Sequence, residues 1–293
     1  IAPQREKRPH DIQFVKSLKR KNASCVFCPG VVEKNNDVLV TEKINEKSKT
    51  WDIMVINNKF PAVSLRNPKA YGQQEVIIES SSHKAQFDGL SQEHIAKILE
   101  VCAQRTKIIS ENQNIEYILI YKNTGGSAGA SLQHPHSQIF ATSFLPPHLL
   151  DKSQRVQEYK LKRARCVYCD VIAKEAKGPR LIYKDKNIIA FAPYASMYNY
   201  ECWIMPWRHL DNITLLNQEE RMSFAKILKV ILKKIFKLHL SYNYYFHQVV
   251  HDEDQHLYMK IVPRGSVWAG VEIGSGVIIN PVSPEDAAKY YRK

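Results

Sequence analysis

The stretch HPHSQIFA, residues 134–141, predicts a β-strand that begins with histidine and carries a second histidine two residues later. The stretch HLYMKIVP, residues 256–263, has the same form with a single histidine. An apolar, aromatic run precedes each of them across one turn, IEYILIYKN at 115–123 and YNYYFHQVV at 242–250. A strand, a turn and a histidine-led strand therefore occur twice, which indicates an internal repeat.

The repeat extends toward the N-terminal part of each half. Two C-x2-C pairs, CVFC at 25–28 and CVYC at 166–169, come first. A strand-like segment that ends in histidine follows each pair, EVIIESSSH at 75–83 and ECWIMPWRH at 201–209. The order of cysteine pair, strands and histidine is thus the same in both halves.

One long helix is predicted in each half, between the two histidines. Its pattern begins nine residues after the first histidine in both halves, at Gln92 and at Gln218. Ser91 and Asn217 precede these residues and are suitable N-caps. Mixed strands around one long helix per half favour an α+β fold over alternating βαβ units.

The sequence predicts two domains, 1–150 and 151–293. The charged segment DKSQRVQEYKLKRAR at 151–165 lies between the halves and has the composition of a solvated helical connector. We therefore place the boundary near residue 150.

Each half supplies two cysteines and two histidines, the donor set of a tetrahedral structural zinc site. The first set comprises Cys25, Cys28, His83 and His134, and the second comprises Cys166, Cys169, His209 and His256. A single C-x2-C pair is weak evidence, because redox motifs also contain it. Two pairs with histidines at matching places in a repeat favour zinc, and a degenerate knuckle with ordinary core partners is the alternative.

The second histidine of HPHSQIFA has no counterpart in the other half. His134 corresponds to His256, but the position of His136 corresponds to Tyr258. A reactive group needed only once would show this asymmetry. Neutral imidazole is a competent nucleophile near neutral pH, so His136 is the candidate catalytic residue.

The run NTGGSAGAS at 123–131 precedes this histidine pair. Its small residues allow backbone N–H groups to surround an anion, and Asn123, Ser131 and Gln138 add neutral polar groups. With His136, the run favours nucleotidyl transfer through a phosphohistidine-type intermediate. A glycine-rich hairpin turn is the alternative interpretation.

The chain is strongly basic, with 42 − 29 = +13 charges and a pI near 9.3. This balance favours an anionic partner such as a nucleotide or a nucleic acid. A solvated helix face, as in KILKVILKKIFKLH at 226–239, is the alternative source of the charge. A nucleic-acid-binding zinc ribbon is disfavoured, because the two C-x2-C pairs lie far apart, and we expect no nucleic acid partner.

A cytoplasmic protein without a membrane partner is expected. No apolar run of about 18 residues occurs, and charges interrupt the N-terminal residues 1–20 where a signal peptide needs an apolar stretch. Paired cysteines fit metal or redox chemistry in a reducing compartment. Cys102 and Cys202 lie in apolar surroundings, and we expect both in the core.

The motif HPHSQ preceded by GAS resembles the active-site signature of the galactose-1-phosphate uridylyltransferases, a branch of the histidine-triad superfamily. Further similar segments are IAPQREKRPHD at 1–11, CVFC, NNKFPAV at 57–63, EVIIESSSH and GVEIGSGVIINPVSPEDAA at 270–288. The last of these also resembles the ADP-glucose phosphorylases.

This resemblance implies two tandem histidine-triad-like domains, each an antiparallel sheet with packed helices. It implies a ping-pong reaction in which His136 takes a uridylyl group from UDP-glucose and passes it to galactose 1-phosphate. A nucleotide sugar and a hexose 1-phosphate would be the substrates, and a homodimer is possible. The alternative is an ADP-glucose phosphorylase or adenylyltransferase with inorganic phosphate as the acceptor.

The resemblance also implies roles for individual residues. Gln138 and Ser131 would act with His136 in catalysis, and zinc would occupy the first site. In the second site the C-x2-C pair of Cys166 and Cys169 itself favours zinc. The implied substrate-binding residues are Arg5, Arg8, Asn58, Asn123, Gly129, Ser131, Gln138 and Glu272. Lys59 follows Asn58 where some members of the family have aspartate, which changes the expected ribose contact.

Overall fold

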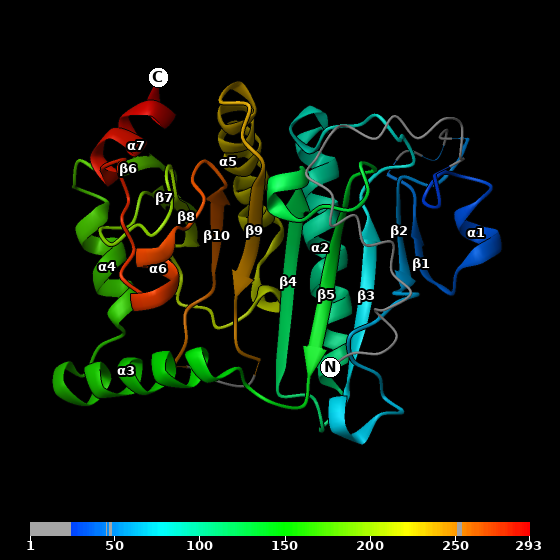
Figure 1. Cartoon of the computed structure of the whole chain (residues 1–293), viewed down its shortest axis with the longest axis horizontal. Helices are drawn as coiled ribbons and strands as arrows, with labels where there is room; N and C mark the ends of the chain where they lie inside the picture. The colour runs from blue at the N-terminus through cyan, green and yellow to red at the C-terminus, as the bar shows by residue number, and fades with distance from the viewer. Residues whose placement is uncertain (1–24, 45, 47–48, 251–253) are drawn as a thin grey trace.

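Ten β-strands form one antiparallel sheet within residues 25–44, 46, 49–250 and 254–293, which this computed structural model describes (Figure 1). The strands are β1 (Val38–Glu42), β2 (Ile53–Asn57), β3 (Gly72–Ile78), β4 (Tyr117–Thr124), β5 (His136–Thr142), β6 (Leu181–Lys184), β7 (Ile188–Phe191), β8 (Cys202–Pro206), β9 (Tyr242–His247) and β10 (Tyr258–Pro263). Helices pack against this sheet, and the predicted α+β class is confirmed.

The order of the strands repeats between the two halves. It runs β1-β2-β3-β5-β4-β9-β10-β8-β7-β6, so the first half reads 1-2-3-5-4 from its edge and the second reads 6-7-8-10-9 from the other edge. The equivalent strands β4 and β9 pair at the centre, with Tyr121 opposite Tyr245. The predicted division into domains at residue 150 stays a prediction, because the two halves share one continuous sheet.

Seven α-helices accompany the sheet in the described residues. They are α1 (Val32–Asn35), α2 (Gln92–Ser110), α3 (Pro147–Arg163), α4 (Val167–Glu175), α5 (Gln218–Lys237), α6 (Gly270–Ser275) and α7 (Pro284–Arg292). The Ser91 side chain accepts a bond from the N–H of His94, and Asn217 forms a capping box with Glu220. Both predicted N-caps are therefore confirmed, and α3 confirms the helical connector.

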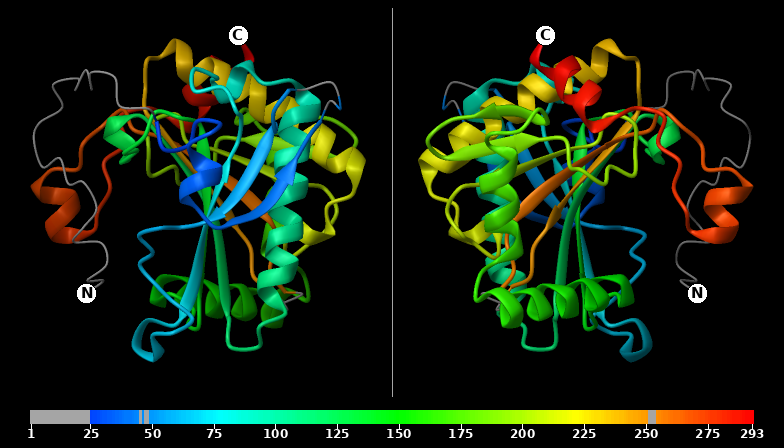
Figure 2. Two further views of the ribbon diagram at one scale, coloured as in Figure 1. Left: turned by 90° about the vertical axis from the view of Figure 1, so that its right-hand side faces the viewer. Right: turned by 90° about the vertical axis from the view of Figure 1, so that its left-hand side faces the viewer.

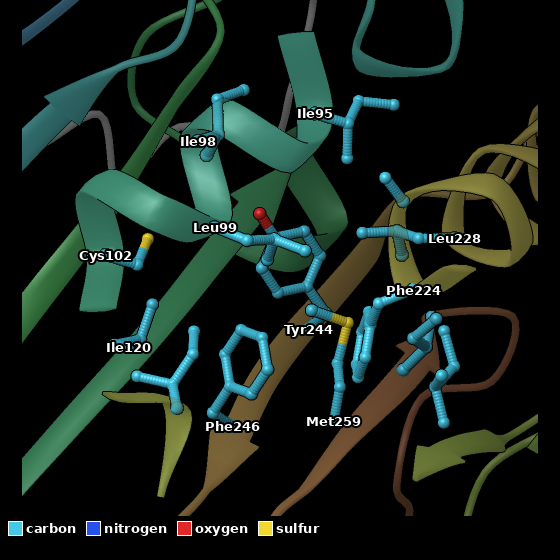
Figure 3. Packing of buried hydrophobic residues seen from close by; sticks show 14 of the residues in the cluster. Ile95, Ile98, Leu99, Cys102, Ile120, Phe224, Leu228, Tyr244, Phe246 and Met259 are labelled. Carbon is cyan, nitrogen blue, oxygen red and sulfur yellow. The ribbon is translucent and has the colours of Figure 1, made fainter. Parts of the chain in front are cut away.

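Helices α2 and α5 cover one face of the sheet (Figure 2). Both helices contribute an apolar stripe to one continuous core that extends across the two halves. Figure 3 shows Leu99 of α2 and Phe224 of α5 converging on Tyr244 and Phe246 of the central strand β9. Cys102 and Cys202 are buried in this core, as predicted.

On the opposite face of the sheet, the described residues form one apolar cluster toward each edge. Near β2 and β3, Phe27 and Trp51 join a small cluster that includes the α1 residue Val32. Near β7 and β8, residues of α3 and α4 such as Val156 and Ile172 join a second cluster. The centre of this face, over β4, β5 and β9, is where the sequence placed its candidate catalytic residues.

The histidine-led strands begin two residues later than predicted. Strand β5 starts at His136 and β10 at Tyr258, so His134 and His256 lie before the strands. Pro135 has no N–H to donate to the sheet, although its carbonyl accepts a bond from the Glu79 N–H at 3.0 Å. The ring of His134 bonds to the carbonyl of Ser80, which holds the chain at this point.

Much of the excess basic charge lies on solvated helix faces. Lys226, Lys233 and Lys237 of α5 are exposed, while the apolar stripe of the helix is buried. This confirms the interpretation of residues 226–239 as a helix with one wet face. Among the described helices, none combines the length and the apolar character needed to cross a membrane.

The ion pair between Arg105 of α2 and Glu75 of β3 ties the helix layer to the sheet. The guanidinium donates from Nε to Oε2 at 2.8 Å and from Nη2 to Oε1 at 2.6 Å, and the carboxylate is fully buried. Two parallel bonds of this kind satisfy both carboxylate oxygens.

We predict that Arg105→Met lowers the free energy of unfolding by about 3–5 kcal/mol, because it leaves the Glu75 carboxylate buried without its cation. The double variant Arg105→Met, Glu75→Leu should recover most of this loss, since no buried charge remains. Urea unfolding measures both. In the exposed pair of Lys186 with Glu219, Lys186→Met should leave stability close to wild type, and an equally small effect of Arg105→Met would contradict the prediction.

Candidate functional site

Cys25, Cys28, His83 and His134 come together in the first half as predicted. Their ligand atoms all lie within 4.8 Å of one another. The Cys28 Sγ is 3.7 Å from His83 Nδ1 and 3.9 Å from His134 Nδ1. Tetrahedral zinc holds sulfur and nitrogen ligands roughly 3.5 Å apart, given bonds of about 2.3 and 2.0 Å. The four side chains are therefore arranged as a metal site requires.

Cys166, Cys169, His209 and His256 form the equivalent group in the second half. The Cys169 Sγ is 3.4 Å from His209 Nδ1 and 3.7 Å from His256 Nδ1. A hydrogen bond from Cys169 lowers the pKa of Cys166 to about 3, so one thiolate forms readily here. Both predicted donor sets could thus hold a metal ion.

The buried histidine of each group is oriented in the same way. His134 Nε2 lies 2.7 Å from the carbonyl oxygen of Ser80, and His256 Nε2 lies 3.1 Å from that of Pro206. A carbonyl only accepts, so Nε2 carries the proton in both rings. Nδ1 then presents its lone pair to the cysteines, which is the tautomer that a metal needs.

His136 does not belong to this donor set, although Pro135 alone separates it from His134. Its Nδ1 donates to the main-chain carbonyl of His134 at 2.8 Å, which leaves the lone pair on Nε2. The edge of the Phe27 ring packs against it at 5.4 Å between centroids. Burial, and then the positive charge of Lys122, lower the pKa of His136 and keep the ring neutral.

A buried charged network underlies His136 on the helix side of the sheet. Lys122 forms an ion pair with Glu79 and donates to the main-chain carbonyl of His136 at 3.1 Å. Ser137 donates to the other oxygen of Glu79 and lies 3.0 Å from the hydroxyl of Tyr244. This network was not predicted from the sequence. The feature that could have indicated it is Lys122, because this lysine occupies a position of the alternating strand β4 that faces the helices, where apolar residues are expected.

Gln138 lies on β5 two residues after His136, so both side chains are on the same face. Its Oε1 accepts bonds from Gln74 Nε2 at 2.9 Å, Tyr121 Oη at 2.9 Å and Asn58 Nδ2 at 3.4 Å. The predicted residues Asn58 and Gln138 are therefore brought together. Gln74 and Tyr121 were not among the predicted site residues.

The small-residue run forms a tight turn rather than an open anion nest. The N–H groups of Ala128, Gly129 and Ala130 donate to carbonyls within the turn, at 2.9–3.2 Å. Gly125 has a φ of 85°, and a Cβ on it would lie 2.2 Å from the Ser241 hydroxyl of the second half. Glycine is needed there for close packing between the halves.

The remaining predicted residues are distributed around this turn and beyond it. Asn123 lies on β4, where its Oδ1 accepts a bond from Asn243 at 2.8 Å, and Ser131 lies in the exposed chain before His134. Glu272 lies on α6, which projects from the sheet (Figure 2), and accepts a bond from the Ala269 N–H at 2.9 Å. Arg5 and Arg8 lie outside the described residues.

The counterpart of the His136 position in the second half is filled by side chains. Tyr258 stacks on Trp203, with centroids 4.3 Å apart and an interplanar angle of 11°. Lys152 of α3 contacts the Tyr258 hydroxyl and lies over the rings of Tyr258, Trp203 and Tyr168. Burial lowers the pKa of Lys152 to about 7. The second half thus keeps the metal-type group but has a tyrosine, Tyr258, at the position equivalent to His136.

A cavity of about 490 Å³ lies at the centre of this face, where β4 and β9 meet. Tyrosines from both strands line it, together with Asn123 at the end nearest the small-residue turn. Its other polar lining residues are His148, Tyr198, Asn243, His247 and Arg264. Both halves therefore line this cavity, and its lining residue Tyr121 donates a hydrogen bond to Gln138, although neither Gln138 nor His136 lines it.

Known proteins are similar to this chain along most of its length. Residues 1–146 match the family described as galactose-1-phosphate uridyl transferase, N-terminal domain. An ADP-glucose phosphorylase of Arabidopsis thaliana is 32% identical over 100% of this chain and 89% of its own length. A galactose-1-phosphate uridylyltransferase of Thermotoga maritima is 30% identical over 85% of this chain and 86% of its own length.

A solved structure agrees with the fold. The crystal structure of an ADP-glucose phosphorylase from Arabidopsis thaliana with bound ADP-glucose has a TM-score of 0.84 and 31% identity, and the match covers 99% of this chain and 94% of that one. The family resemblance of the HPHSQ motif is thereby confirmed over both halves. The chain belongs to the galactose-1-phosphate uridylyltransferase family.

Proposed function

We propose that this protein is a UDP-glucose–hexose-1-phosphate uridylyltransferase that works through a covalent intermediate on His136. The observation that carries the proposal is the orientation of this ring, whose Nδ1 donates to the His134 carbonyl at 2.8 Å and whose Nε2 keeps its lone pair. Relatives named galactose-1-phosphate uridylyltransferase support the reaction class.

The reaction takes place in two displacements. His136 Nε2 attacks the α-phosphorus of UDP-glucose, the bond from that phosphorus to the bridging oxygen breaks, and glucose 1-phosphate leaves with the electron pair. A phosphate oxygen of galactose 1-phosphate then attacks the same phosphorus, the P–N bond breaks, and the imidazole regains its lone pair. The product is UDP-galactose, and His136 returns to its starting state.

The other predicted site residues serve this transfer. Gln138 and Ser131 donate hydrogen bonds to the phosphoryl oxygens, whose charge is carried through both displacements. Asn123, Gly129, Asn58 and the basic residues Arg5 and Arg8 bind the nucleotide sugar. Glu272 binds the sugar hydroxyls.

A second candidate function is an ADP-glucose phosphorylase with inorganic phosphate as the acceptor. The observation that favours it is the relative of that name, which is 32% identical over 89% of its own length. The two candidates share His136 and the covalent step, and they differ in the base and in the group that attacks the intermediate.

Incubation with UDP-glucose radiolabelled in its α-phosphate should leave acid-labile label on the wild-type protein and none on His136→Asn, whose turnover should fall about 10⁴-fold or more. His239→Asn is the matched control, because His239 is exposed and its φ of 54° suits asparagine. Release of the label by galactose 1-phosphate supports the uridylyltransferase. Label from ADP-glucose that inorganic phosphate releases would instead establish the phosphorylase, and full turnover by His136→Asn would contradict both.

We further propose that both cysteine–histidine groups bind structural zinc. Each offers four ligands and no open position for substrate, as structural sites do. Zinc would hold the chain before β5 and before β10 in place, and no step of the transfer passes through it. All six cysteines are free thiols, which fits the reducing cytoplasm that we propose as the location.

Metal analysis should find two zinc ions per chain, one lost in Cys25→Ser and the other in Cys166→Ser. Each loss should lower the unfolding midpoint, because metal binding contributes to folding free energy. Cys102→Ala, in the core, should retain both ions. Fewer than one zinc per wild-type chain after growth with added zinc would contradict the proposal.

A homodimer completes the proposed site. Glu272 lies on α6, which stands off the sheet, and apolar side chains around it face solvent, with Val267 95% and Ile273 74% exposed. Apolar surface of this kind favours burial against another protein. We propose that a second copy covers this surface and that Glu272 then contributes to the sugar site of that copy.

The double variant Val267→Ser, Ile273→Ser should therefore shift the protein from dimer to monomer in analytical ultracentrifugation, and its turnover should fall together with the dimer fraction. Leu161→Ser is the control, since Leu161 is 85% exposed and belongs to a different helix, α3. A monomeric wild-type protein with full activity would contradict the proposal.

A further inference from the structure

Gln138 can assist the transfer only if the correct end of its side-chain amide meets the substrate. The NH₂ group donates to phosphoryl oxygens, whereas the amide oxygen would repel them. The two ends have nearly the same shape, so packing alone does not choose between them. Hydrogen bonds to neighbouring side chains must fix the orientation.

Three donors converge on the amide oxygen of Gln138. They are Gln74 Nε2 at 2.9 Å, Tyr121 Oη at 2.9 Å and, more distantly, Asn58 Nδ2 at 3.4 Å. Gln74 also donates toward the Tyr121 hydroxyl at 3.3 Å, which orients that hydroxyl proton toward Gln138. With its oxygen held in this way, Gln138 has its NH₂ group left for the substrate.

The orientation of the donors is itself fixed by main-chain groups. The N–H of Ala62 donates to Gln74 Oε1 at 3.0 Å, and the N–H of Phe60 donates to Asn58 Oδ1 at 2.9 Å. A backbone N–H cannot accept a hydrogen bond, so both amide oxygens must face the loop. Their NH₂ groups must then face Gln138.

The environment makes this orientation costly to reverse. Gln74 is only 4% exposed, and it lies on β3 directly beside β5, with Val76 opposite Gln138 in the register. A flipped Gln138 would place its NH₂ group against the NH₂ groups of the buried Gln74 and the half-buried Asn58, and leave both without this acceptor. The loop at residues 58–62 also bonds to β3 through the Asn58 N–H and the Gln74 carbonyl at 2.9 Å.

We propose that Gln74 and Tyr121 are positioning residues for the transfer to His136, which hold the Gln138 amide with its NH₂ group toward the phosphoryl oxygens. The inference rests on the proposed function, because it concerns the same covalent step. A series of hydrogen bonds thus leads from the main-chain N–H of Ala62 through the Gln74 side chain to Gln138. Neither Gln74 nor Tyr121 needs to touch the substrate.

The test is the rate of label transfer from the nucleotide sugar to His136, measured by rapid quench at saturating substrate. Gln74→Leu removes the NH₂ group that donates to Gln138, and the rate of label transfer should fall about 10- to 100-fold. This decrease is no larger than the one expected when a residue that itself donates to the transition state is removed. Gln74→Glu should be slower still, because its carboxylate accepts from Gln138 and turns the amide oxygen toward the phosphate. Tyr121→Phe should lower the rate about 3- to 10-fold.

A double-variant cycle separates positioning from general damage to the fold. In a Gln138→Ala background, Gln74→Leu should cost less than about twofold further, because the amide that it orients is gone. Gln73→Leu is the matched control on the same strand, since the Gln73 side chain bonds to Glu75 on the helix side, and it should label at the wild-type rate. Urea unfolding of each variant is recorded alongside.

The outcomes are distinct. Wild-type rates in Gln74→Leu and Tyr121→Phe would overturn the inference and leave the proposed function intact. An equal loss from Gln74→Leu with and without Gln138 would also overturn it, since Gln74 would then act through something else. No label on the wild-type protein from UDP-glucose or ADP-glucose would refute the proposed function, and the inference would fall with it.

Discussion

His134 connects the cysteines of the first donor set, the chain after β3 and the His136 ring. Nδ1 of the ring faces the cysteines, Nε2 donates to the Ser80 carbonyl at the end of β3, and the main-chain carbonyl accepts from His136 Nδ1. The same residue therefore belongs to the metal-type group and fixes the tautomer of the next histidine. A metal ion on Nδ1 would make this arrangement rigid, and rigidity is what a nucleophile needs if its lone pair must meet phosphorus at one angle.

The two halves share topology but have diverged at one place on equivalent strands. A histidine of a Cys2His2 donor set precedes each of the strands β5 and β10. In both halves, the aromatic residue inside the C-x2-C pair packs against the first residue of that strand: Phe27 packs against His136, and Tyr168 packs against Tyr258. In the second half, Lys152 from the connecting helix fills the space above the rings. The connector therefore fills the space at Tyr258, and on this face of the sheet the position of His136 remains for chemistry.

The fold and the two donor sets could be predicted from the sequence because both depend on the spacing of residues along the chain. A repeat, a C-x2-C pair and an N-cap are sequence patterns that can be interpreted without knowledge of the tertiary structure. The orientation of Gln138 could not be found in this way, since it depends on β3 and β4 lying on either side of β5. The internal bonds of the small-residue run could not be predicted either, because only three-dimensional contacts show that Ala128, Gly129 and Ala130 use their N–H groups within the turn.

The charged network under His136 depends on a residue of the second half. Glu79 and Lys122 are buried, and burial of such a pair is costly unless further hydrogen bonds satisfy both ions. Ser137 supplies one of these bonds from the first half, and Tyr244 supplies another from β9 of the second half at 3.4 Å. Pairing of β4 with β9 is what brings the Tyr244 hydroxyl to the carboxylate. Without the second half, the sheet would end at β4, and water would reach the ion pair that supports the main chain of His136.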